Sequence, residues 1–154
     1  MRVMALDIGE KRIGIAISDP DERVATPLSV LDASQVERGE KAFKRLLEVW
    51  EPELFLVGLP LTLHGEEGPQ SLRIRSVASG ISARFGIPVE YSDERLSSRE
   101  AKRILREEGL SEREMRGKID MIAANVFLQA WLDEKASDNA DASAKFAGAG
   151  TTIE

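Results

Sequence analysis

The stretch ALDIGEKRIGIAISD, residues 5–19, places an acidic residue, a glycine and a basic pair between two apolar segments. Isoleucine alternates with small residues in its second half, and this period of two predicts antiparallel strands over 3–8 and 12–18, joined by a short turn. Asp7 falls at the tip of the first strand. Asp7 is therefore either a solvated turn residue or a carboxylate that a metal ion or a phosphate can reach.

Extended and helical patterns alternate along the next hundred residues. Pro27 favours an edge position for the third strand, because proline cannot donate to a sheet ladder. Serine followed three residues later by glutamate, as at Ser34 and Ser97, is typical of a helix start. The predicted elements are strands at 24–31, 54–58 and 88–94, helices at 34–52, 69–85 and 97–109, a further turn from 111, and a last helix around 119–130.

This order predicts an α/β protein with a central mixed five-stranded sheet flanked by helices. The apolar run at 54–58 is typical of a parallel strand that is covered on both faces. We expect one domain over residues 1–133. Residues 134–154 are rich in Ala, Ser, Gly and Asp without periodicity, which predicts a flexible tail.

Composition limits the classes of function. The chain has 154 residues, no cysteine and a formal net charge of -6. A disulfide framework and a thiolate metal site are excluded, and non-specific coating of nucleic acid is disfavoured. A local basic excess occurs over 95–118, where eight Lys or Arg face five Glu. Without a leader or a long apolar run, we expect a cytoplasmic protein that makes no membrane contact.

Carboxylates end two of the predicted strands and lie on the last helix. Asp7 ends the first strand, Asp93 and Glu94 end the last strand, and Asp120 lies near the predicted helix start. Sites in α/β sheets form outside the carboxyl ends of strands, so these acids could converge. Steps of 100° per residue place Asp120 a quarter turn from an apolar stripe centred on Ile119, Val126 and Ala130. Three carboxylates would suit Mg²⁺, with Mn²⁺ as an alternative, better than zinc.

Four ordered blocks resemble the YqgF family, also called RuvX, of bacterial RNase H-like nucleases, over about residues 1–133. The blocks are ALDIGEKRIGIAISD, LVGLPLTLHGEEG, YSDERLSSREAKRIL and KIDMIAANVFLQAWL. The resemblance implies an RNase H-like fold and a nuclease that trims the 5′ end of precursor 16S ribosomal RNA within ribosomal precursor particles. It also implies a role in Holliday-junction resolution, by likeness to RuvC.

The acids of the family motifs coincide with the acids at the strand ends and on the last helix described above. The resemblance assigns the catalytic and metal-binding acids to Asp7, Glu94 and Asp120. It assigns phosphate contacts to Lys11, Arg12 and Arg95, and a groove-lining loop to 58–65. The choice between Asp93 and Glu94 stays open, because neighbouring strand residues point to opposite faces.

Three alternatives remain beside an RNA-processing nuclease. A Holliday-junction resolvase acting on branched DNA would share the phosphodiester chemistry and would call for a two-fold dimer, so both a monomer and a homodimer are considered. A non-catalytic RNA-binding factor in ribosome assembly would carry vestigial acids. A kinase or ATPase of the actin-like superfamily would need a second Asp-Gly loop, and the chain offers no second copy of this unit.

Overall fold

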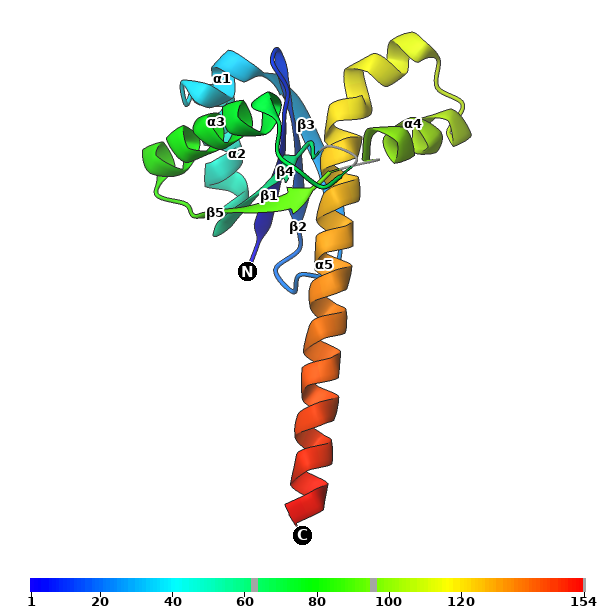
Figure 1. The fold of residues 1–154 in the computed structure, drawn as a ribbon. Coiled ribbons are helices and arrows are strands. Elements are labelled where there is room, and N and C mark those ends of the chain that lie inside the picture. Colours follow the sequence, from blue (N-terminus) through cyan, green and yellow to red (C-terminus); the bar gives the residue numbers. More distant parts are fainter. Residues whose placement is uncertain (62–63, 95–96, 154) are drawn as a thin grey trace.

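The computed structural model describes residues 1–61, 64–94 and 97–153, with side chains described for 1–61, 64–94 and 100–142. A five-stranded sheet in the order β3-β2-β1-β4-β5 forms its centre, with helices on both faces (Figure 1). β1 pairs antiparallel with β2 and parallel with β4, so the sheet is mixed as predicted. The elements are β1 Val3–Ile8, β2 Arg12–Ser18, β3 Ala25–Asp32, α1 Ala33–Glu37, α2 Lys41–Trp50, β4 Leu54–Leu59, α3 Pro69–Phe85, β5 Val89–Asp93, α4 Ser97–Glu107 and α5 Glu112–Ile153.

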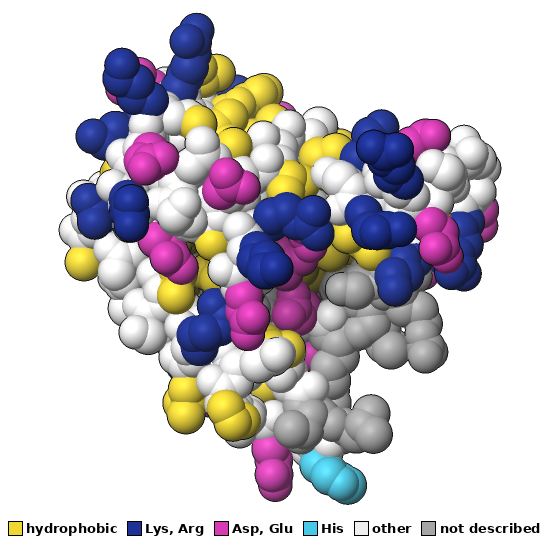
Figure 2. All heavy atoms as spheres, turned by 90° about the horizontal axis from the view of Figure 1, so that it is seen from above, with side chains coloured by type: hydrophobic (Ala, Val, Ile, Leu, Met, Phe, Trp, Pro, Cys, Tyr) yellow, Lys and Arg dark blue, Asp and Glu magenta, His cyan; other side chains and the backbone are white. Residues whose placement is uncertain are grey.

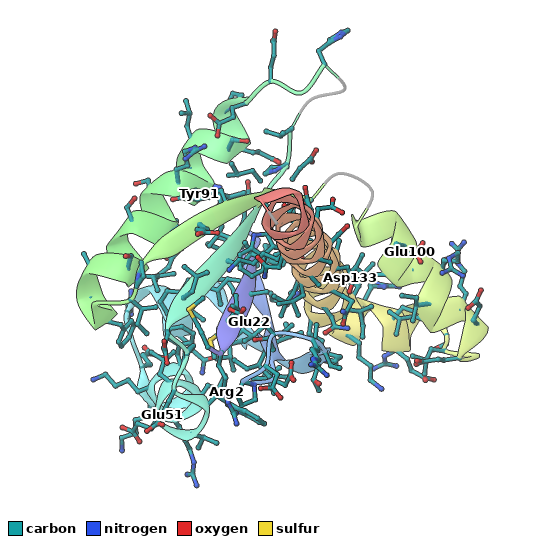
Figure 3. All side chains as sticks on the ribbon, turned by 90° about the horizontal axis from the view of Figure 1, so that it is seen from below. Arg2, Glu22, Glu51, Tyr91, Glu100 and Asp133 are labelled. Carbon is teal, nitrogen blue, oxygen red and sulfur yellow. The ribbon has the colours of Figure 1, made fainter. Side chains whose placement is uncertain are left out.

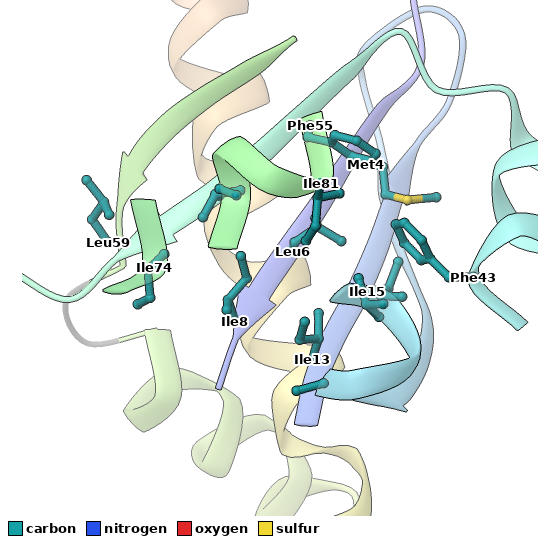
Figure 4. Close-up of a cluster of buried hydrophobic side chains, with 14 of the residues drawn as sticks. Met4, Leu6, Ile8, Ile13, Ile15, Phe43, Phe55, Leu59, Ile74 and Ile81 are labelled. Carbon is teal, nitrogen blue, oxygen red and sulfur yellow. The ribbon is translucent and has the colours of Figure 1, made fainter. Parts of the chain in front are cut away.

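The two faces of the sheet carry separate hydrophobic clusters. On one face, α1, α2 and α3 cover the larger cluster, in which Phe43, Phe55 and Ile81 are almost completely buried (Figure 4). On the other face, α5 covers a smaller cluster in which Phe127 and Leu128 pack with alanines and leucines of the strands. Alternation of side chains along β1 and β4 produces this division, because successive residues point to opposite faces.

The hairpin and the edge strand follow the sequence prediction. In the β1–β2 ladder, Asp7 pairs with Gly14 and Ile8 with Ile13. β3 lies at the edge, and its ladder with β2 shifts register between Ile15 and Ala16. Pro27 is the partner of Ala16 at this irregularity, where a residue without a backbone N–H is tolerated.

The helix predicted over 34–52 is wrong in one respect, because the chain forms two helices there. Gly39 adopts a left-handed φ of 65° and separates α1 from α2. The capping box also differs from the prediction: Asp32 is the N-cap, and Gln35 at the third helical position completes it. Aspartate competes with serine for N-cap positions, so the neighbouring Ser34 gave a misleading signal.

Strand β4, helix α3 and strand β5 lie where the sequence predicts them. β4 is parallel to β1, and β5 is parallel to β4. Helix α3 begins with Pro69, whose missing N–H costs nothing in a first turn, and ends at Gly86 in the left-handed conformation.

The last helix differs most from the prediction. Ser111 accepts a hydrogen bond from the Glu114 N–H at 3.3 Å, and the turn that it caps is the start of one continuous helix, α5. Asp120 is therefore in its third turn rather than near its start. The backbone is helical as far as Ile153, beyond the sheet, and residues 136–142 are exposed (Figure 1). Flexibility of residues 134–154 stays a prediction.

The apolar stripe predicted on this helix is also wrong. The buried residues facing the sheet are Ala124, Phe127 and Leu128, whereas Ala130 is exposed. Helix α4 packs against another side of α5, and Ile119 lies on that side. Figure 3 shows α5 between β5, which carries Tyr91, and α4, which carries Glu100. The sheet and α4 each bury a different side of α5, so the apolar residues of both sides appear in one sequence pattern. The centre of that pattern lies away from the side that faces the sheet.

None of the helices, over the described part of the chain, combines the length and the apolar content that a membrane span requires.

Candidate active site

Asp7 lies on β1 between two glycines of the neighbouring strands. Gly14 of β2 is its direct partner in the antiparallel ladder. On the other side, Gly58 of β4 follows Val57, the parallel partner of Leu6. Residues side by side in a sheet point to the same face, so neither neighbour places a side chain beside the Asp7 carboxylate. The face concerned is the one that α5 covers.

Gly14 allows α5 to approach the sheet. A Cβ atom at Gly14 would lie 2.1 Å from the carbonyl carbon and oxygen of Asp120, a distance that only the absence of a side chain permits. Asp120 precedes Ala124 and Phe127 by one and two turns, so it lies on the sheet-facing side of α5. The close approach places Asp120 at the level of Asp7.

Gly58 makes room for the third acid. A Cβ atom there would lie 2.8 Å from Glu94 Oε2 and 3.0 Å from its Cβ, so the Glu94 side chain occupies the space above this glycine. Asp93 pairs with Leu59, which packs in the cluster on the opposite face of the sheet. The geometry therefore separates the two neighbouring acids and places Glu94, rather than Asp93, beside Asp7.

Burial dominates the electrostatics of Asp7. Burial, the charge of Glu94, a hydrogen bond with Glu94 and the charge of Asp120 together raise the pKa of Asp7 to about 9. Burial also raises the pKa of Glu94, with Asp93 adding to the rise, whereas the hydrogen bond with Asp7 lowers it. At neutral pH, Asp7 thus holds the proton and donates it to the Glu94 carboxylate.

Asp120 has a partner of opposite charge. Arg12 Nε lies 3.4 Å from Asp120 Oδ2, and the Arg12 side chain is 49% exposed. Burial raises the pKa of Asp120, and Arg12 counteracts this rise. Figure 2 shows acidic side chains near the middle of this face with basic side chains beside them. Two features therefore reduce the negative charge of the cluster: Asp7 is protonated, and the Arg12 guanidinium pairs with Asp120.

The donor set fits a hard divalent cation, although it is not preassembled. Carboxylate oxygens are the ligands that Mg²⁺ prefers, and two buried carboxylates that share a proton can exchange that proton for a cation. Among the described residues, no three His, Asp or Glu side chains stand ready to hold a metal ion together. Asp120 is close enough for its charge to raise the pKa of Asp7, and it also pairs with Arg12.

The predicted phosphate contacts lie around the β1–β2 turn. The backbone carbonyl of Lys11 accepts a hydrogen bond from the Ala33 N–H at 2.8 Å, which anchors the turn, and the Lys11 side chain is exposed. Arg12 is next to it and faces Asp120. Arg95 lies outside the described residues, as does part of the predicted groove loop over 58–65.

The sequence prediction missed the two glycines that bring the acids together. Gly14 and Gly58 each stand in an apolar strand, where glycine is unfavourable unless another group approaches closely. The sequence shows that these glycines are unusual for a strand, but it does not show which group approaches them. The contact with α5 joins segments that are far apart in the sequence.

Solved structures share this fold. The Fowlpox virus resolvase, solved in complex with Holliday junction DNA, matches with a TM-score of 0.55 at 12% identity, covering 87% of this chain and 98% of that chain. Thermus thermophilus RuvC matches with a TM-score of 0.51 at 14% identity, covering 89% and 97%. At these identities the likeness concerns the fold, and it confirms the RNase H-like architecture.

Sequence relatives are much closer. A protein of Chloroflexus aurantiacus named "Putative pre-16S rRNA nuclease" is 42% identical over 136 residues, which cover 88% of this chain and 89% of the relative. A protein of the same name from Anaeromyxobacter sp. strain Fw109-5 is 44% identical over 133 residues, which cover 86% and 97%. The family model described as "RuvX: Holliday junction resolvase" matches residues 1–134. Because one model spans most of the chain and these relatives agree with it, the chain belongs to the RuvX family of nucleases.

Proposed function

We propose that this protein is a metal-dependent nuclease that hydrolyses phosphodiester bonds at the 5′ end of precursor 16S ribosomal RNA. The names of relatives above 40% identity support this substrate. The substrate would be met on ribosomal precursor particles in the cytoplasm. A protein with a net charge of -6 requires a local basic surface for this task, and the turn with Lys11 and Arg12 offers one beside the acids.

One observation carries the proposal: a buried carboxylate pair, Asp7 and Glu94, lies beside a third carboxylate, Asp120, from a distant segment. A protein gains no stability from gathering like charges away from water, so such a cluster indicates function. Asp7 lies at the end of a strand, Glu94 directly follows one, and Asp120 lies in the third turn of a helix. This placement keeps their positions defined relative to a bound phosphodiester.

The three acids would hold Mg²⁺ or Mn²⁺, and such a cation, when bound, acts as a Lewis acid that activates water and stabilises the charge of a phosphodiester under attack. Binding and orienting the phosphodiester are the roles of the side chains. Arg12 lies at the exposed side of Asp120, where its other guanidinium donors can bind a phosphate oxygen. Lys11 adds a flexible positive charge on the same turn, and we assign the same role to Arg95.

Holliday-junction resolution is the second candidate. The description of the matching family favours it, and the structural neighbours share the fold. Resolution requires cuts at two symmetric strands, so this reading predicts a two-fold dimer, whereas trimming of a ribosomal RNA end needs only one site. The mass of the protein in solution, with and without a junction, separates the two readings.

A cleavage assay with matched variants tests the proposal. Wild type, Asp120→Asn and Asp133→Asn are each incubated with a precursor 16S RNA fragment and with a four-way DNA junction, with Mg²⁺ or with EDTA. Asp133 is a suitable control because it lies on the same helix, is exposed and accepts a hydrogen bond from Gln129 that asparagine can also accept. We expect Mg²⁺-dependent cleavage of the RNA, a loss of about 100-fold or more in Asp120→Asn, and no change in Asp133→Asn.

Three results would contradict the proposal. Cleavage that persists in EDTA or in Asp120→Asn would mean that the acids do not carry the reaction. Tight binding of the RNA without cleavage under any metal condition would favour the non-catalytic assembly factor. Cleavage of the junction alone, by a dimer, would favour the resolvase.

A further inference from the structure

A groove lies between α4 and the first turns of α5, beside the carboxylate cluster. The two helices pack as a hairpin that stands to one side of the sheet (Figure 1). Between them is a cavity of about 220 Å³, which we call the hairpin groove; it is lined by Lys102, Arg106, Glu112, Met115, Arg116 and Ile119. Nothing in the carboxylate chemistry described above uses this groove.

Three cations line the hairpin groove. Lys102 and Arg106 lie one turn apart on α4, and Arg116 faces them from α5. In the described part of the chain, none of the three makes a salt bridge. Arg103, one residue along from Lys102, is by contrast tied to two glutamates of its own helix. Among the described side chains of α4, Arg103 is thus neutralised, whereas Lys102 and Arg106 are available to a ligand.

Among the described residues that line the groove, three are basic and one, Glu112, is acidic, so this lining has an excess of two positive charges. Met115 is 7% exposed and forms an apolar part of the floor. An anion seated there would meet cations from both helices. Figure 2 shows Lys and Arg side chains gathered over this part of the molecule.

Helix α5 connects the groove directly with the carboxylate cluster. Ile119 lines the groove, and the next residue, Asp120, belongs to the cluster. Arg116 precedes Asp120 by four residues, which is a rise of about 6 Å along the helix axis. That distance is comparable with the separation of successive phosphates on an extended strand, so one strand can reach both places.

We propose that the hairpin groove binds the phosphodiester backbone of the substrate strand beyond the bond that is cut, through Lys102, Arg106 and Arg116. This inference rests on the proposed nuclease function and adds a second, non-catalytic anchoring point to it. Arginine can bind a phosphate through two donors, and lysine supplies a mobile point charge. Such contacts fix the register of the strand and are indifferent to its bases.

The test compares two triple variants that lose the same charge. One is Lys102→Ala/Arg106→Ala/Arg116→Ala, and its control replaces three cations of another surface cavity on α2 by alanine: Lys41→Ala/Lys44→Ala/Arg45→Ala. Helix α2 covers the opposite face of the sheet. Both variants are made in an Asp7→Asn background and are studied in EDTA. Each is titrated into a fluorescent single-stranded RNA at several salt concentrations. The RNA has about 12 nucleotides, which is within the range of site sizes of single-strand-binding proteins.

For the groove variant we expect a loss of affinity of about 10-fold or more and a salt slope that is smaller by about 2, because three phosphate contacts on a single strand are removed. The control should lose less than about 2-fold and keep its salt slope. DNA of the same sequence should show the same loss, since the contact is with phosphate. Thermal unfolding checks that both variants are folded.

The proposal is overturned if the groove variant and the control lose affinity equally, or if the loss appears with only one of the two nucleic acids. Failure of the proposed function looks different. If wild type cleaves neither RNA nor junction but the groove variant still loses its salt-dependent binding, the groove assignment stands and the catalytic one does not. If wild type cleaves and the groove variant binds like the control, only the groove assignment fails.

Discussion

The two faces of the sheet are built for different tasks. The face under α1, α2 and α3 buries large side chains such as Phe43 and Phe55, whose ring centroids lie 6.2 Å apart. The face under α5 has a smaller apolar cluster and, at the end of β1, two glycines and a buried acid pair. The first face stabilises the fold, and the second carries groups that destabilise it while no cation is bound. This division predicts opposite consequences for substitutions on the two faces.

The largest effect is expected in the core of the first face. Phe43 is fully buried and contacts Phe55 and Phe85, so Phe43→Ala should lower the free energy of unfolding by about 3 to 5 kcal/mol. Urea unfolding measures this loss, and Val49→Ala, at an exposed position of the same helix, serves as the control. Cleavage per folded molecule should be unchanged in Phe43→Ala. If cleavage falls by more than the unfolded fraction accounts for, the first face also affects catalysis, and the two faces do not have separate tasks.

Asp7→Asn should raise the free energy of unfolding and abolish cleavage. Asparagine can donate a hydrogen bond to Glu94 without first taking up a proton on folding, so the metal-free protein should gain about 2 to 4 kcal/mol at neutral pH while cleavage is abolished. Urea unfolding in EDTA and the cleavage assay measure the two changes. Loss of stability together with loss of cleavage would show that Asp7 supports the fold, contrary to the comparison.

Gly14→Ala should disturb the site by moving a helix. Its Cβ would collide with the Asp120 backbone, which is not free to rotate away, and overpacking of this kind costs about 1 to 3 kcal/mol. Gly80→Ala is the matched control, because nothing lies within 4 Å of its Cβ position in α3, and it should stabilise by about 0.5 to 1 kcal/mol. Retention of full cleavage by Gly14→Ala would mean that the close approach of α5 is dispensable.

The smallest effect, counted per pH unit, is a change of stability with pH in the absence of metal. The folded-state pKa values of Asp7, Glu94 and Asp120 are all raised, so the folded protein keeps protons that the unfolded chain has released. Stability should therefore fall as pH rises from about 4 toward 9, by about 1 kcal/mol per pH unit near neutrality. Asp7→Asn should flatten this slope in urea titrations at several pH values. A stability that increases with pH over this range would refute the protonated pair.

Local signals in the sequence were sufficient for most of the fold. Alternating isoleucines identify β2, and Pro69 and Gly86 mark both ends of α3, because these residues have conformational preferences that act at their own positions. The break at Gly39 was missed because the apolar spacing continues across it. The stripe on α5 was misplaced because two packing partners, the sheet and α4, bury two sides of one helix.

The candidate site was predictable in its members but not in its arrangement. Strand ends and helix position selected Asp7 and Asp120, and the family motif favoured Glu94. The separation of Glu94 from Asp93 depends on the register of β5 against β4, which a single sequence does not reveal. The contact of Arg12 with Asp120 likewise depends on the docking of α5, because the two residues are distant in the chain.

The contact between Gly14 and Asp120 joins the second strand to the last helix. During translation, β1 and β2 leave the ribosome long before α5 is made. A nascent chain therefore exposes its first acid without the third, and it cannot complete the cluster until α5 has been made and has docked.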